Sequence, residues 1–157
     1  MTNEISIPSV FDVANYIIKL ANEQKDEDFN NLSEWITHLK LQKLLYFTQA
    51  TFLACLDKLA FNDPIVAFKY WPVVEAIYKK YSPCWRNFLD VEVGRDENIL
   101  SEDDRKAIKR VWEIYWGYSS SRLVEMTHSH NPRKHTSQSS EIDTKSIKNF
   151  YQWKISL

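Results

Sequence analysis

The chain has 157 residues, and its 20 lysine and arginine residues nearly balance 21 aspartate and glutamate residues. A chain of this length fits one domain that buries roughly two-thirds of its unfolded surface, and the charge balance gives no general attraction to nucleic acid or anionic membrane. Only two glycines occur, so Gly-rich phosphate-binding loops are excluded. The N-terminal residues carry no leader pattern, no 18-residue apolar run occurs, and the two cysteines are isolated, so we expect a cytoplasmic protein without membrane contact.

The first predicted elements are two helices. Apolar residues recur at helical spacing over residues 10–25 after a capping Ser9, and residues 24–31 are predicted to form a loop. Thr37 is the predicted N-cap of a second helix over residues 39–56, which is apolar on nearly all sides. This helix is therefore expected at the centre of the fold, with Lys40, Gln42 and Lys43 as its polar positions. If Gln42 is buried, its amide should be hydrogen-bonded within the fold.

A short antiparallel pair is predicted next, with residues 59–61 and 65–70 as strands around an Asn62-Asp63-Pro64 turn. Trp71-Pro72 is predicted to open a short helix, because proline is favoured in the first helical turn. Ser82-Pro83 should end that helix. Residues 84–100 are predicted to be irregular, with a possible short strand at 89–93.

The C-terminal part is predicted to be helical. Ser101 should cap a helix that reaches Tyr115 and ends at Gly117 in a left-handed conformation. A helix from Ser119 or Ser120 should end before Asn131-Pro132, followed by a loop over residues 133–140. The last predicted helix covers residues 142–155, with four inward side chains: Ile147, Phe150, Tyr151 and Ile155. The predicted fold is mainly α, a compact bundle of five or six helices around a central buried helix, with a small two-stranded β element.

No residue pattern indicates catalysis, a metal site or a cofactor. His128, His130 and His135 lack the ligand spacing of a zinc site, so we interpret His128 as a helix-end residue. Cys55 is predicted to be a buried apolar side chain, and no nucleophile signature surrounds it or Cys84. The basic residues Arg105, Lys106, Lys109 and Arg110 share a helix with four acids, some of them one turn away, which indicates a solvated, self-compensated helix face. The acids are Glu102, Asp103, Asp104 and Glu113.

Several segments in a fixed order resemble the Panacea antitoxin domain family, the SocA-like or phage-associated-protein group, over about residues 10–155. The resemblance rests on Val13-Ala14-Asn15-Tyr16, Leu39-Lys40-Leu41-Gln42-Lys43-Leu44-Leu45-Tyr46-Phe47, Phe61-Asn62-Asp63-Pro64-Ile65, Phe68-Lys69-Tyr70-Trp71-Pro72-Val73-Val74, Trp112-Glu113-Ile114-Tyr115, Gly117-Tyr118-Ser119 and Leu123-Val124-Glu125-Met126-Thr127-His128 with Pro132. The chain departs from the family at Trp71-Pro72, where Gly-Pro is usual, and at Pro132-Arg133, where Pro-Trp is frequent.

The resemblance implies a non-enzymatic protein that neutralises a toxin protein encoded by a neighbouring gene, often on a prophage. Direct binding that blocks the toxin is the favoured interpretation. Delivery of the toxin to an ATP-dependent protease and regulation through nucleic-acid binding are the alternatives. Because both departures lie where partner contacts are expected, the hypothesised contact residues are those of the 69–75 turn and the 127–134 segment: Lys69, Tyr70, Trp71, Pro72, Glu75, Thr127, His128, Arg133 and Lys134.

Overall fold

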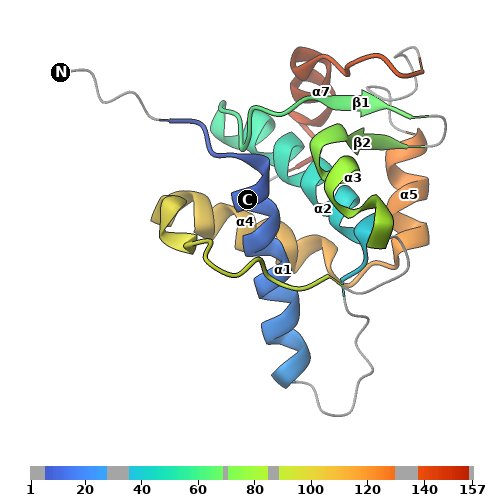
Figure 1. Ribbon diagram of the computed structural model, residues 1–157. Coiled ribbons are helices and arrows are strands. Elements are labelled where there is room, and N and C mark those ends of the chain that lie inside the picture. Colours follow the sequence, from blue (N-terminus) through green and yellow to red (C-terminus); the bar gives the residue numbers. More distant parts are fainter. Residues whose placement is uncertain (1–5, 28–35, 69–70, 85–88, 130–137, 156–157) are drawn as a thin grey trace.

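The computed structural model describes residues 6–27, 36–68, 71–84, 89–129 and 138–155 (Figure 1). Within them the chain forms six α-helices and a two-stranded antiparallel sheet, which confirms the predicted fold class. The helices are α1 (Val10–Glu27), α2 (His38–Thr51), α3 (Glu75–Tyr81), α4 (Glu102–Tyr115), α5 (Ser120–Ser129) and α7 (Thr144–Tyr151), and the strands are β1 (Ile65–Ala67) and β2 (Pro72–Val74). None of the helices in these ranges has the length and apolarity needed to cross a membrane.

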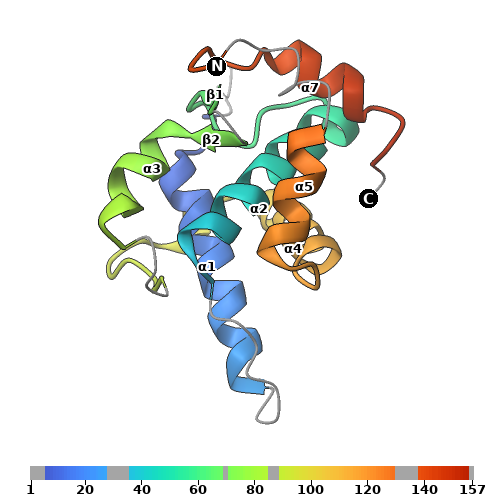
Figure 2. The same cartoon turned by 90° about the vertical axis from the view of Figure 1, so that its right-hand side faces the viewer.

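Helix α2 lies at the centre of the molecule, as predicted. Figures 1 and 2 show α1, α4, α5 and the sheet around it, and every residue of α2 except Leu39 is buried. The Thr37 hydroxyl accepts a hydrogen bond from the Lys40 N–H at 3.3 Å, which confirms the predicted N-cap. Beyond Thr51 the helix continues as a π-helix, η1 (Phe52–Leu56), and ends at Asp57 with a φ of 52°. The predicted helix over residues 39–56 is therefore one continuous helical segment with two hydrogen-bond patterns.

The sheet differs from the prediction. β1 pairs with β2, with Ile65 opposite Val74 and Ala67 opposite Pro72, whereas residues 59–61 form no strand. The prediction that Trp71-Pro72 opens a helix is also wrong, because α3 begins only at Glu75. Proline lacks an N–H and therefore suits the outer edge of a sheet, and the two valines after it favour extended backbone.

A further extended segment lies beside β1. The Ala67 N–H donates to the Ser140 carbonyl at 2.9 Å, and the Ile142 N–H donates to the Ile65 carbonyl at 2.8 Å. Val66 and Glu141 face each other in an antiparallel bridge. β1 is thus covered on both edges, by β2 and by residues 139–142, so β2 alone presents its outer edge to α2.

Several predicted boundaries need correction. α1 continues to Glu27, into the segment predicted as a loop, and residues 89–93 form no strand. Gly117 does not adopt the predicted left-handed conformation, since α4 ends with Trp116 in a right-handed cap. α7 covers only Thr144–Tyr151, shorter than the predicted 142–155. The Ser101 cap is confirmed, because its hydroxyl accepts from the Asp104 N–H at 3.1 Å.

Cys55 is half-buried rather than buried as predicted. It lies in η1, where the helix widens, and its thiol donates a weak hydrogen bond to the Ile155 carbonyl at 3.4 Å. Ile155 follows α7, so this contact joins the end of the central segment to the C-terminal part of the chain. The aromatic core lies next to it, where Phe47 stacks on Tyr115 with ring centroids 4.2 Å apart.

Candidate functional site

The outer edge of β2 is paired by a side chain rather than by another strand. The Gln42 Oε1 accepts from the Val74 N–H at 2.8 Å, and the Gln42 Nε2 donates to the Val74 carbonyl at 3.2 Å. One amide thus satisfies both backbone groups of Val74, as a neighbouring strand would. This confirms the internal hydrogen bonding expected for Gln42, and it fixes the hairpin of β1 and β2 on α2.

His38 completes this arrangement. Its Nε2 lies 3.1 Å from the Gln42 Nε2, and because an amide nitrogen only donates, the His38 Nε2 must be the acceptor. The ring is therefore neutral, with its proton on Nδ1. Burial lowers the pKa of His38 to about 4, in agreement with this neutral form. The ring also contacts Tyr78 and Tyr81 of α3, with centroid distances of 5.9 and 6.3 Å.

Lys43 connects α2 to the end of the hairpin. Its side chain is fully buried, its Nζ donates to the Pro72 carbonyl at 3.3 Å, and the same Nζ lies 5.2 Å from the centre of the Trp71 indole ring. Lys40 uses the same combination at α4, with its Nζ 2.8 Å from the Trp116 carbonyl and 4.0 Å from that indole. Each lysine thus combines a hydrogen bond to a backbone carbonyl with a cation–π contact to a tryptophan, Lys40 within Trp116 and Lys43 across Pro72 and Trp71; sequence alone did not reveal this role.

The residues proposed as partner contacts fall into different environments. Glu75 is exposed, Trp71 is half-buried, and Pro72 and Thr127 are buried. Lys69, Tyr70, Arg133, Lys134 and the His128 side chain lie outside the described part of the structure. β2 and α5 both pack against α2, so the two elements that carry Pro72 and Thr127 lie against the same helix. Within the described part, Trp71 and Glu75 are the two with accessible side chains.

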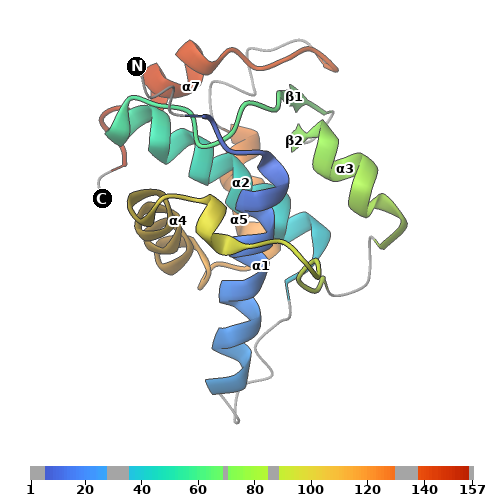
Figure 3. The ribbon, with the colours of Figure 1, turned by 60° about the vertical axis from the view of Figure 1, so that its left-hand side comes forward.

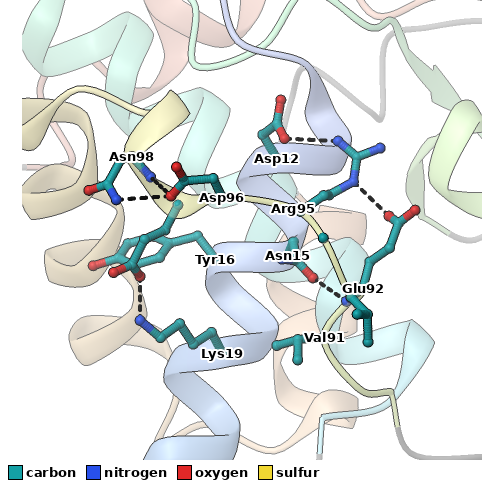
Figure 4. Close-up of a pocket in the computed structure, with 12 residues that line it drawn as sticks. Asp12, Asn15, Tyr16, Lys19, Val91, Glu92, Arg95, Asp96 and Asn98 are labelled. Carbon is teal, nitrogen blue, oxygen red and sulfur yellow. Dashed lines mark hydrogen bonds and ion pairs between the residues drawn. The ribbon is translucent and has the colours of Figure 1, made fainter.

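A second surface feature escaped the sequence analysis. Residues 89–100, here called the strap, cross α1 (Figure 3). Between the strap and α1 lies a pocket of about 410 Å³ (Figure 4). Asp12, Asn15, Tyr16 and Lys19 of α1 form one wall, and residues 91–98 of the strap form the other. Leu89 and Leu100 are buried at its two ends, and the Asn15 Oδ1 accepts from the Glu92 N–H at 2.6 Å.

Charged groups of the pocket pair with one another across three elements. Arg95 bonds the Asp12 carboxylate at 2.8 Å and the Glu92 carboxylate at 2.6 Å, and Lys80 of α3 reaches the same Glu92 oxygen at 2.5 Å. Lys19 also bonds Glu97. The hydrogen bonds from Lys80 and Arg95 lower the pKa of Glu92 to about 2. The only sequence signal for this network is the single arginine among the acids of the strap, and its partners are too distant in sequence to be inferred.

Other candidate groups give no site of their own. Two of the basic side chains of α4 pair with acids one turn away, Lys106 with Glu102 at 3.2 Å and Arg110 with Glu113 at 3.5 Å, as expected of a self-compensated face. Arg105 instead donates to the Asn98 Oδ1 at 3.0 Å. Among the described residues, no group of three or more His, Cys, Asp and Glu side chains could hold a metal ion.

The family model described as "Antitoxin SocA-like, Panacea domain" matches residues 41–133. The match covers more than half of the chain, from α2 through the hairpin, α3, the strap and α4 to the residues after α5. No curated protein and no solved structure shows significant similarity. The match includes Gln42, Lys43 and Trp71.

Proposed function

This chain belongs to the SocA-like antitoxin family with the Panacea domain, and we propose that it neutralises a cognate toxin protein by binding it directly. The family supports an antitoxin-type role and a toxin partner in general. The finer parts of the proposal are that the toxin is encoded by a neighbouring gene, that the two proteins meet in the cytoplasm, and that the bound antitoxin covers the active surface of the toxin.

The observation that carries the proposed mechanism is the fixed position of the hairpin. Gln42 and Lys43 hold β2 from inside the fold, and Trp71 lies half-buried at the end of the hairpin over the Lys43 ammonium group. Tryptophan is enriched among residues that dominate binding energy at interfaces. A surface held rigid before binding loses less conformational entropy when the complex forms. We therefore propose Trp71 and the exposed Glu75 at the centre of the toxin contact.

The second proposed contact is the 127–134 segment, which begins in the last turn of α5. Thr127 is buried, so its part is to position this segment rather than to touch the toxin. Its hydroxyl donates to the Val124 carbonyl at 3.1 Å within α5. His128, Arg133 and Lys134 then remain the proposed contacts.

The test is a toxicity rescue with the product of the neighbouring open reading frame. That protein is expressed alone and together with this chain, and the two are tested for co-purification. We expect growth arrest by the neighbour alone, rescue by co-expression and a stable complex. Rescue without a complex and with faster loss of the neighbour would support delivery to an ATP-dependent protease instead. A harmless neighbour that does not bind would contradict the pairing.

The contact surface is tested with two tryptophan variants. Trp71→Ala should weaken rescue and complex formation, whereas Trp153→Ala, at a residue 89% exposed after α7, should leave both unchanged. Because Trp71 also packs on Lys43, its loss could act through folding. Glu75→Lys changes an exposed side chain that pairs with Lys79 at 3.6 Å in α3, so stability is measured alongside binding. Weaker binding by this variant at unchanged stability would support the proposed surface. Wild-type binding by both Trp71→Ala and Glu75→Lys would refute it.

A further inference from the structure

Two valines of the strap, Val91 and Val93, are exposed to solvent. Val91 is 38% exposed and Val93 is 97% exposed, while Glu92 between them points toward Arg95 and Lys80. Val93 stands in a turn before Gly94, which has a φ of +91°. Turns usually carry small or polar residues, so a fully exposed β-branched side chain there has no folding role. We call Val91 and Val93 the strap tip.

The strap tip is held in place by its surroundings. Arg95 joins the strap to α1 through Asp12, and Glu92 joins it to α3 through Lys80. Lys80 and Arg95 also lie over the Phe11 ring, with distances of 4.9 and 5.5 Å to its centre. The exposed valines are thus fixed in one orientation, which lowers the entropy lost on binding.

The strap itself carries a net negative charge. The strap carries four carboxylates and a single arginine. Glu92 and Glu97 are paired with basic residues, whereas Asp90 and Asp96 have no ion-pair partner among the described residues and instead accept hydrogen bonds from asparagine amides. A partner that buries the valines therefore meets two uncompensated carboxylates, and complementary charge on its surface would be positive.

We propose that the strap tip is a second contact surface for the toxin, and that it binds an apolar depression with a basic rim on that protein. This inference rests on the proposed antitoxin function and adds the chemistry of the partner's surface. Because Lys80 links α3 directly to the strap, one partner can contact the start of α3 at Glu75 and the strap tip at the same time.

The experiment measures the affinity of the purified neighbouring gene product for the full chain and its variants. Val91→Thr with Val93→Thr replaces one methyl of each valine by a hydroxyl and keeps the β-branched shape. We expect Kd to rise about tenfold. Ile99→Thr is the matched control, since Ile99 is 62% exposed at the other end of the strap. Its Kd should equal that of the wild type.

The charge is tested separately. Asp90→Asn with Asp96→Asn keeps hydrogen-bond acceptors at both positions and removes both charges. The association rate should fall, and the binding should depend less steeply on salt than in the wild type. If the wild type binds and rescues while the double threonine variant retains its Kd, the strap-tip inference is wrong and the antitoxin function stands. If the wild type neither binds nor rescues, both are wrong.

Discussion

Replacing Gln42 by leucine tests how the hairpin is fixed to the central helix. The substitution keeps most of the side-chain volume, so it creates little cavity. It removes the acceptor of the Val74 N–H and the donor to the Val74 carbonyl, and both groups lie at buried Val74. An unsatisfied buried polar group costs on the order of 1–3 kcal/mol. The two Val74 groups together predict a loss of about 2–6 kcal/mol, a large part of the roughly 5–15 kcal/mol that stabilises a typical protein. The buried His38 Nε2 also loses its donor, which adds to this loss.

Gln49 provides a matched control two turns further along α2. Its Oε1 accepts from the Ala60 N–H and its Nε2 donates to the Phe61 carbonyl, both at 2.8 Å. Gln49→Leu should therefore lower the free energy of unfolding by a similar amount. The two variants differ in which amide proton becomes exchangeable. Protection at Val74 should be lost only in Gln42→Leu, and protection at Ala60 only in Gln49→Leu.

Urea unfolding followed by tryptophan fluorescence gives the stability change, and native-state hydrogen exchange gives the two protection factors. The reasoning fails if Gln42→Leu unfolds within about 0.5 kcal/mol of the wild type, the range expected of a neutral surface change. It also fails if the Val74 amide keeps its protection in Gln42→Leu. Either result would mean that the sheet holds the hairpin without the glutamine.

Three further predictions concern the buried side chains of His38 and Lys43 and the Arg95 ion pair of the strap. The pKa of His38 is about 4 in the folded chain and 6.5 in an exposed histidine. The stability that the neutral ring contributes is therefore complete above pH 6.5 and is lost as the pH falls toward 4, by about 3 kcal/mol in all. A pH series of urea midpoints should show this slope in the wild type and a flatter slope in His38→Gln. Lys43→Met should lower the free energy of unfolding by about 1–3 kcal/mol, because the Pro72 carbonyl loses a donor. Lys106→Met, on the exposed face of α4, is the control and should leave the free energy of unfolding unchanged in the same urea assay. Arg95→Gln should speed proteolytic cleavage within the strap, since Arg95 joins the strap to Asp12. The urea midpoint of global unfolding should change much less than the cleavage rate. An unchanged cleavage rate would contradict the role given to this ion pair.

The local pattern of the sequence identified the helices and several of their ends. A helix that is apolar on nearly all sides has to be surrounded, which placed residues 39–56 at the centre. Thr37 and Ser101 cap the helices that follow them, because a hydroxyl at that position satisfies an otherwise unpaired backbone N–H. The resemblance to the antitoxin family likewise needed only the order and spacing of short segments, and the matched range of residues 41–133 lies within it.

The tertiary structure alone decided which segments pair. Residues 59–61 and 72–74 both carry apolar side chains that suit a strand, and the choice between them depends on contacts with α2. The Gln49 side chain hydrogen-bonds the Ala60 N–H and the Phe61 carbonyl. The Gln42 side chain hydrogen-bonds the outer backbone edge of Val74, so the inner edge of β2 pairs with β1. The ion pair of Asp12 with Arg95 joins positions 83 residues apart. Local spacing determines helices because their hydrogen bonds are local, but such long-range pairs form only once the folded core brings the segments together.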